Sequence, residues 1–141
     1  INKGLLNTSA TAVLIGTDTY KRPWVRYEIF KSMIKGNGVI GIHVNEIKGK
    51  DGKTKNIGKN PFEYLAIRFS DDGKKMTMLE WKNNNWVEYT EIGNSASITI
   101  KQTSKDKWGK QYKLSKYYKT KKWKSDKGYS NFGTWIENIA K

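Results

Sequence analysis

The chain has 141 residues, of which 36% are hydrophobic and 13% aromatic, which fits one folded domain. Cysteine is absent and His43 is the only histidine, which excludes disulfide frameworks and thiolate sites and nearly excludes Ser-His-Asp catalysis. The net charge of +14 leaves two interpretations open: an anionic partner, or a lysine-rich composition that keeps a protein soluble.

The first part of the chain predicts a strand, a helix and a second strand in succession. Residues 1–7 are expected to form the end of a helix, and the apolar run at 11–15 (TAVLI) predicts a buried strand. A helical period follows from 24 to 35, with Pro23 suited to its first turn. Residues 39–44 (VIGIHV) predict the next buried strand. Short links between these segments indicate a βαβ unit with a parallel sheet.

A long loop and an antiparallel meander are predicted next. Residues 45–61 are rich in Gly, Lys and Asn, and loops of this length are often functional. Alternating patterns at 65–70, 75–82 and 86–89, separated by turn sequences, predict three antiparallel strands. Residues 95–100 predict a further short strand.

The last third of the chain interleaves lysines with aromatic residues from 101 to 127. Such a segment would suit a nucleic-acid surface, because rings stack on bases and lysines follow phosphates. We favour a C-terminal cap with buried aromatic residues and solvated lysines, because a small sheet needs covering on its second side. Thr134, with Glu137 three residues later, has capping-box spacing and predicts a closing helix over 134–140.

Two short patterns could carry chemistry. Trp24 and Glu28 are four residues apart, which places them on one helix face, one turn apart. Taken alone, Glu28 is most simply a surface residue favoured by the helix dipole. Residues 36–41 have the letters of the dinucleotide-binding pattern G-x-G-x-x-G, but they follow a predicted helix and open a strand. We therefore interpret them as a helix stop and a turn.

The chain resembles the TIR-like proteins of the Thoeris anti-phage defence system, of the ThsB type. The resemblance is carried by TSATAVLIGTDTYKRPWVRYEIFKSMIKGNGVIGIHV, by KNPFEYL, and by the later SDDGKKMTMLEWKNNNWVEY and DKGYSNFGTWIEN. It implies an α/β, flavodoxin-like TIR-type fold, with a parallel sheet flanked by helices, an added antiparallel hairpin and a basic C-terminal extension. It implies a single domain over 1–141: a βαβ core at 1–64 with the catalytic helix, a hairpin region at 65–100 and a Lys/aromatic-rich extension at 101–141.

The W-x-x-x-E pattern resembles that of TIR domains that consume NAD+. The resemblance implies an NAD+ glycohydrolase or ADP-ribose cyclase of the bacterial cytoplasm, with NAD+ as substrate and neither a metal nor another cofactor. Its product would be a cyclic ADP-ribose-type signal that activates a separate ThsA-type NAD-consuming effector. Glu28 aligns with the family's catalytic glutamate, and Trp24 is expected to shape the pocket. Tyr20, Thr17 and Asp18, after the first strand, are further expected substrate contacts.

The resemblance also implies a departure from the family. Its members begin with a further strand, helix and loop ahead of the segment that matches Ile1, so we expect this chain to lack the N-terminal strand and helix. Backbone groups left unpaired would then favour a homo-oligomer, or leave the chain inactive. Two alternatives to the enzyme stay open: a non-catalytic TIR-like assembly module and, less favoured, a nucleic-acid-binding protein whose binding falls steeply with salt. No membrane partner is expected.

Overall fold

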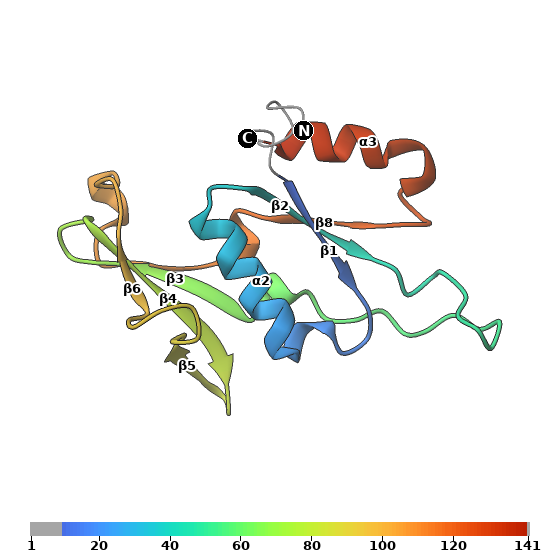
Figure 1. Ribbon diagram of the computed structural model, residues 1–141, viewed down its shortest axis with the longest axis horizontal. Coiled ribbons are helices and arrows are strands. Elements are labelled where there is room, and N and C mark those ends of the chain that lie inside the picture. Colours follow the sequence, from blue (N-terminus) through green and yellow to red (C-terminus); the bar gives the residue numbers. More distant parts are fainter. Residues whose placement is uncertain (1–9, 141) are drawn as a thin grey trace. The chain divides into compact units, whose positions relative to one another are not determined.

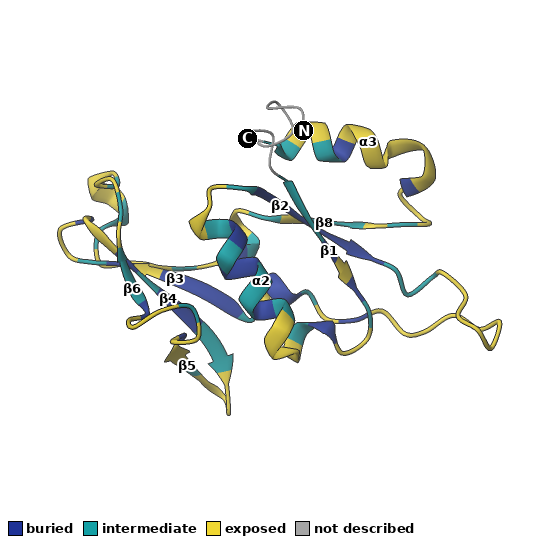
Figure 2. Cartoon of the chain, viewed as in Figure 1, coloured by how far each residue is buried: buried dark blue, intermediate teal, exposed yellow. Residues whose placement is uncertain are grey.

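The computed structural model describes residues 10–140, and the chain divides into two compact units (Figure 1). The first unit comprises Ile1–Pro61 and Tyr118–Lys141, and the second comprises Phe62–Tyr117. The helix end that the sequence predicts over 1–7 lies outside the described residues. Each unit has its own sheet and its own buried residues (Figure 2).

The first unit contains a three-stranded parallel sheet. Its strand order is β1 (Ala10–Ile15), β2 (Gly38–His43) and β8 (Lys119–Lys122), with β2 in the centre. β1 and β2 pair along their whole lengths, which confirms the predicted βαβ unit. The sequence pattern did not predict β8, because its residues KTKK have none of the apolar run that marks a buried strand.

Helix α2 (Pro23–Ile34) connects β1 to β2 and begins with Pro23 in its first turn, as predicted. The hydroxyl oxygens of Thr11 in β1 and Ser32 in α2 lie 2.9 Å apart, so Thr11 points toward α2. Side chains alternate along a strand, and the register sets Thr11 opposite Val39 and Ile15 opposite His43. Val39 and His43 therefore share the α2 side of the sheet.

Helix α3 (Gly128–Ile139) covers the other side of this sheet. The buried residues Ile40, Ile42 and Trp135 form a core cluster there. Partly buried apolar residues pack against the cluster from β1, the strand ends and α3: Ala12, Val44, Trp123, Ile136 and Ile139.

The predicted start of this closing helix was wrong. α3 begins at Gly128, six residues before Thr134, so Thr134 lies in mid-helix and caps nothing. Its N-cap is Lys127, in the left-handed conformation with φ 56° and ψ 52°. The sequence GYSNFG has little helix propensity. Packing stabilises the first turns of α3 instead, because the Trp123 ring contacts Phe132 edge-on at 5.8 Å between centroids.

The second unit is built on an antiparallel sheet, which confirms the predicted meander. The strand order is β5 (Asn85–Glu88), β4 (Lys75–Lys82), β3 (Leu65–Phe69) and β7 (Gln111–Lys113), and β6 (Ser97–Thr99) also pairs with β4. Buried side chains on these strands and on the adjoining loops fill its core: Leu65, Ala66, Ile67, Met76, Met78, Leu79, Tyr89, Ala96 and Leu114.

Short 3₁₀ helices lie in the connections between the longer elements. They are η1 (Thr19–Lys21), η2 (Pro61–Glu63), η3 (Lys105–Lys107) and η4 (Leu114–Lys116). No helix among residues 10–140 is long and apolar enough to cross a bilayer. A parallel sheet with α2 on one side and α3 on the other, together with a separate antiparallel sheet, agrees with the α/β flavodoxin-like fold that the resemblance implies.

The lysine- and aromatic-rich segment contributes to both units rather than forming one cap. β7 joins the sheet of the second unit and β8 joins that of the first. In the second unit, the Tyr112 ring packs edge-on against Phe69 and Tyr117, at 6.1 and 6.3 Å between centroids. The Lys116 ammonium lies 4.2 Å from the Tyr112 centroid. Lysines here lie over rings as well as in solvent, in a cation–π arrangement.

Candidate functional site

The first half of α2 presents the two residues that the sequence singled out. Trp24 and Glu28 lie one turn apart on the same side of the helix. Ile29 and Phe30 are fully buried, which fixes how the helix is turned. Trp24 is 70% exposed and Glu28 is half-buried. Among the described residues, no hydrogen bond or ion pair engages the Glu28 carboxylate, so a ligand can approach it.

The indole of Trp24 has Tyr27 as its ring partner. The two rings stack with their centroids 6.0 Å apart and their planes 17° from parallel. The Lys31 ammonium lies 5.7 Å from the Tyr27 ring centroid and 3.5 Å from its hydroxyl oxygen. The sequence analysis considered Trp24 together with Glu28 only. The structure adds Tyr27 and Lys31, so an aromatic column of Trp24 and Tyr27, with Lys31 next to it, runs along the helix that carries Glu28.

Arg26 ties the loop before α2 to the helix itself. This residue is buried, and its Nε donates a hydrogen bond to the backbone carbonyl of Tyr20 at 3.1 Å. The hydrogen bond crosses from the first turns of α2 to η1, so the loop that follows β1 cannot move freely from the helix. A buried arginine on the first helical turn was not expected from the sequence, because arginine is mostly a surface residue.

The long loop 45–61 lies against the carboxyl end of β1. The Thr17 hydroxyl donates to the backbone carbonyl of Asn56 at 3.1 Å, and the Lys59 ammonium lies 5.3 Å from the Tyr20 ring centroid. A Cβ atom at Gly58 would lie 1.9 Å from the carbonyl oxygen of Gly16, so this crossing requires glycine. The structure thus brings Thr17 and Tyr20 together under one loop, at the sheet edge where α/β folds bind ligands.

Asp18 is the charged residue among the expected substrate contacts. Its carboxylate lies 3.6 Å from the Lys21 ammonium, and both side chains are more than half exposed. Next to it, the Thr19 hydroxyl accepts a hydrogen bond from the backbone N–H of Gly16 at 2.7 Å. The loop therefore holds its shape through Thr19, and Asp18 stays at the surface.

His43 lies at the carboxyl end of β2, on the α2 side of the sheet. Its side chain is only 7% exposed, and its buried Nδ1 has no hydrogen-bond partner among residues 10–140. Burial lowers the pKa of this imidazole, and the positive charge of Lys122 on β8 lowers it further. His43 is therefore neutral at pH 7. The sequence predicted a buried strand here, but that pattern alone could not extend to the lowered pKa, because Lys122 comes from β8.

The carboxylates and the histidine of the described residues lie apart from one another. Among residues 10–140, no group of three or more histidine, aspartate or glutamate side chains lies close enough together to hold an ion. The chemistry available at α2 is that of one accessible carboxylate beside an aromatic surface. Such a carboxylate can stabilise positive charge that develops on a bound substrate.

Known proteins match this chain in two ways. Residues 1–48, which include Trp24 and Glu28, match the family model described as Thoeris protein ThsB, TIR-like domain. Over 137 residues the chain is 46% identical to a protein of Bacillus cereus (strain MSX-D12) that is provisionally named cyclic ADP-D-ribose synthase ThsB1. This match covers 96% of the chain and 70% of the relative, so it includes both compact units.

Proposed function

The chain belongs to the family of TIR-like ThsB proteins of the Thoeris system, and from this membership we propose that it cleaves NAD+ and makes cyclic ADP-ribose in anti-phage defence. The relative's name states this activity, and its 46% identity to the chain extends over 96% of the chain. The accessible Glu28 carboxylate on α2 is the observation that supports a chemical role for this chain's own residues.

Glu28 acts as the catalytic carboxylate in this proposal. The bond between the ribose and the nicotinamide nitrogen breaks, and its electron pair stays on that nitrogen, so neutral nicotinamide leaves. The ribose becomes oxocarbenium-like, and a carboxylate beside it stabilises the positive charge, as in glycoside cleavage. A nucleophilic group of the same ADP-ribose then attacks the ribose carbon, and the proton that this group loses is released to solvent. The ring closes without consuming water.

The aromatic column supplies a surface for a planar part of NAD+. Trp24 stacks on Tyr27 and its indole is still 70% exposed, so much of the ring is open to a ligand. Stacking on an exposed indole is worth about 1–3 kcal/mol per base in nucleotide complexes. Thr17, Asp18 and Tyr20 in the loop after β1 are proposed as further substrate contacts, supported by their place at the carboxyl end of the parallel sheet.

The wider setting of the reaction follows from the family. The cyclic nucleotide is proposed to activate a ThsA-type NAD-consuming effector in the bacterial cytoplasm, and the enzyme is proposed to work as a homo-oligomer. The domain is proposed to act as one TIR-like module. NAD+ is consumed as a substrate, so no other cofactor takes part in the scheme.

The test is NAD+ consumption by the wild-type chain and by Glu28→Gln, at high protein concentration, with products identified by mass spectrometry. Glu137→Gln is the matched control, since Glu137 is an exposed glutamate on α3 in the same unit. We expect nicotinamide and a nucleotide one water lighter than ADP-ribose from the wild type and the control, and loss of at least 100-fold in Glu28→Gln.

The same assay is run on a longer chain that carries the relative's residues outside the match, which are about a third of its length by the 70% coverage. Turnover that survives Glu28→Gln would move the chemistry to another residue. A folded chain with no turnover in either length would instead favour the non-catalytic assembly module.

A further inference from the structure

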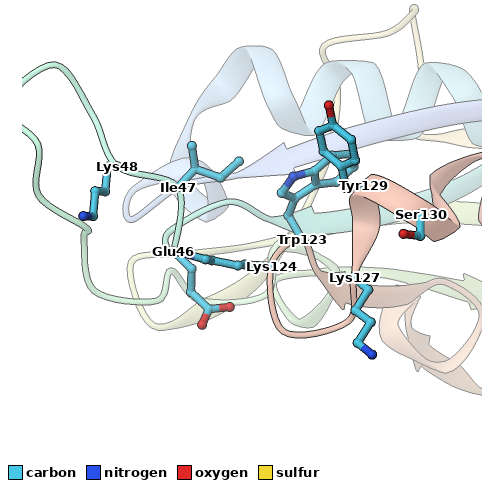
Figure 3. Close-up of a pocket in the computed structure, with 8 residues that line it drawn as sticks. All are labelled: Glu46, Ile47, Lys48, Trp123, Lys124, Lys127, Tyr129 and Ser130. Atoms are coloured by element: carbon cyan, nitrogen blue, oxygen red, sulfur yellow. The ribbon is translucent and has the colours of Figure 1, made fainter.

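A cavity lies on the α3 side of the first unit, at the carboxyl ends of β2 and β8 (Figure 3). Its volume is about 490 Å³, within the range of roughly 300–1,000 Å³ that small-molecule sites occupy. The loop after β2, the turn after β8 and the start of α3 line it with Glu46, Ile47, Lys48, Trp123, Lys124, Lys127, Tyr129 and Ser130. None of these residues belongs to α2 or to the loop before it.

Hydrogen bonds hold the wall of this cavity in place. The Glu46 carboxylate accepts from the Ser125 hydroxyl at 2.6 Å and from the Ser125 backbone N–H at 3.3 Å. These bonds connect two segments that are 79 residues apart in the chain. In the same turn, the Asp126 carboxylate accepts from the backbone N–H of Lys122 at 2.7 Å. A wall built in this way needs little ordering when a ligand binds.

The indole of Trp123 is held by the helix that follows it. The backbone of Gly128 lies against the indole so closely that an added Cβ would sit 2.3 Å from a ring carbon. The backbone N–H of Gly128 also donates to the Trp123 carbonyl at 2.6 Å. Trp123 is therefore a fixed ring in the wall of the cavity.

Aromatic and apolar groups make one part of the lining. Trp123, Ile47 and Tyr129 surround the cavity in Figure 3. Tyr129 is 94% exposed, so its ring contributes almost nothing to the core of the unit. An exposed tyrosine next to a fixed indole offers a flat ligand two rings to contact.

Positively charged side chains make up the other part of the cavity lining. Lys48, Lys124 and Lys127 line the cavity, and none has an ion-pair partner among the described residues. Glu46 does not neutralise them fully, because it brings one negative charge against the three lysines of the lining. The N-terminus of α3, a helix of 12 residues, adds the positive end of its dipole. A ligand that fits must therefore carry negative charge.

We propose that this cavity is a second nucleotide site, which binds a nucleoside phosphate with its base against Trp123 and Tyr129 and its phosphate among Lys124, Lys127 and Lys48. The site is separate from Glu28 and performs no chemistry. It gives the enzyme a place where a nucleotide that is not the substrate can bind. The proposal stands on this cavity alone and does not depend on the proposed NAD+ reaction.

The test is a titration of the 15N-labelled full chain with AMP, followed by the tryptophan indole N–H signals in NMR spectra. We expect saturable shifts of the Trp123 indole and of the Gly128 and Tyr129 amides, with adenosine and inorganic phosphate each binding at least tenfold more weakly. Tyr129→Ser should weaken AMP binding about five- to tenfold, because it removes one stacking ring. Lys124→Gln should weaken it by a similar factor and reduce its salt dependence.

Lys35→Gln is the matched control, since Lys35 is an exposed lysine at the other end of the same unit, after α2. It should leave AMP affinity unchanged, and so should Glu28→Gln. The proposal is overturned if AMP gives no saturation at millimolar concentration, or if Tyr129→Ser and Lys124→Gln bind it as well as the wild type does. It is also overturned if the shifts occur at the Trp24 indole and not at Trp123. None of these outcomes bears on catalysis, which Glu28→Gln tests separately.

Discussion

The rings of Trp24 and Tyr27 stack at 6.0 Å and 17°, and Trp24 remains 70% exposed. An indole this exposed gains little from the fold, because most of its apolar surface stays in water. Its contact with Tyr27 nevertheless fixes its orientation one turn before Glu28. The pair is therefore better suited to binding the ring of a ligand than to forming part of the core.

Removing the indole should affect turnover more than stability. We expect Trp24→Ala to lower the free energy of unfolding by no more than about 1.5 kcal/mol, the usual worth of an aromatic pair. NAD+ turnover should fall tenfold or more, which corresponds to about 1.4 kcal/mol in the transition state. Trp24→Phe should retain most of the activity. Denaturant unfolding and the nicotinamide assay measure the two effects.

Ile34→Ala is the control for Trp24, because Ile34 is 40% exposed on the same helix but lies in its last turn, at the end away from Trp24 and Glu28. It should leave turnover unchanged. Equal losses of turnover in Ile34→Ala and Trp24→Ala would assign the effect to the helix as a whole.

The crossing of Gly58 over Gly16 should tolerate no side chain. A Cβ at residue 58 would meet the Gly16 carbonyl oxygen at 1.9 Å, and backbone cannot yield as a flexible side chain does. We expect Gly58→Ala to destabilise the protein by about 1–3 kcal/mol, as for other overpacked sites, and to raise the KM for NAD+ because the loop at the β1 end is displaced. Thermal unfolding and steady-state kinetics are the measurements.

Gly49→Ala is the matched control in the same loop. A Cβ there would have its nearest neighbour at 3.6 Å, an ordinary contact. Its unfolding free energy should stay within about 0.5 kcal/mol of the wild type, as at most surface sites. If Gly58→Ala were equally harmless, the close approach at Gly16 would be wrong.

His43 should make stability depend on pH on the acid side. Burial and then Lys122 lower the pKa of the folded imidazole below its ordinary value of 6.5, so the unfolded chain binds the proton first as the pH falls. Because the unfolded state then holds more protons, stability is full above pH 6.5 and is lost as pH falls from 6.5 toward the folded pKa. Denaturant unfolding between pH 5 and 8 measures this slope.

The variant His43→Leu should flatten that slope. It removes the titrating group and also the buried Nδ1 that has no hydrogen-bond partner. Replacing such a group by an apolar one of similar size is expected to be neutral or stabilising at pH 7. An unchanged slope in His43→Leu would assign the pH dependence to the carboxylates instead.

The β4–β5 hairpin should accept glycine at its second turn position. Asn83 and Asn84 form a two-residue connection with φ of 53° and 64°, as a type I′ turn requires. We expect Asn84→Gly to raise the free energy of unfolding by up to about 1 kcal/mol and Asn84→Val to lower it by 1 kcal/mol or more, since β-branched residues disfavour positive φ. Urea unfolding of both variants checks this, and a stable Asn84→Val would exclude the turn type.

Local sequence was sufficient for the βαβ unit and for the meander. The apolar runs at 11–15 and 39–44, the helical period between them and the turn residues at 83–85 are short-range signals, and each dictates its own backbone. The spacing of Trp24 and Glu28 also lies within one helix, so it placed both residues correctly on one side. What the sequence added about NAD+ came from the family resemblance.

Tertiary structure alone decided the rest. β8 is a strand because β2 offers it a hydrogen-bonding edge, although KTKK has no apolar pattern. α3 begins at Gly128 because the ring of Trp123 covers its first turns. Three further features depend on segments that lie tens of residues apart. They are the contact of Gly58 with Gly16, the burial of the His43 Nδ1, and the lysine-rimmed cavity. The free energy of these features comes from close packing and desolvation. Both depend on neighbours in space, so they produce no periodic pattern in the sequence.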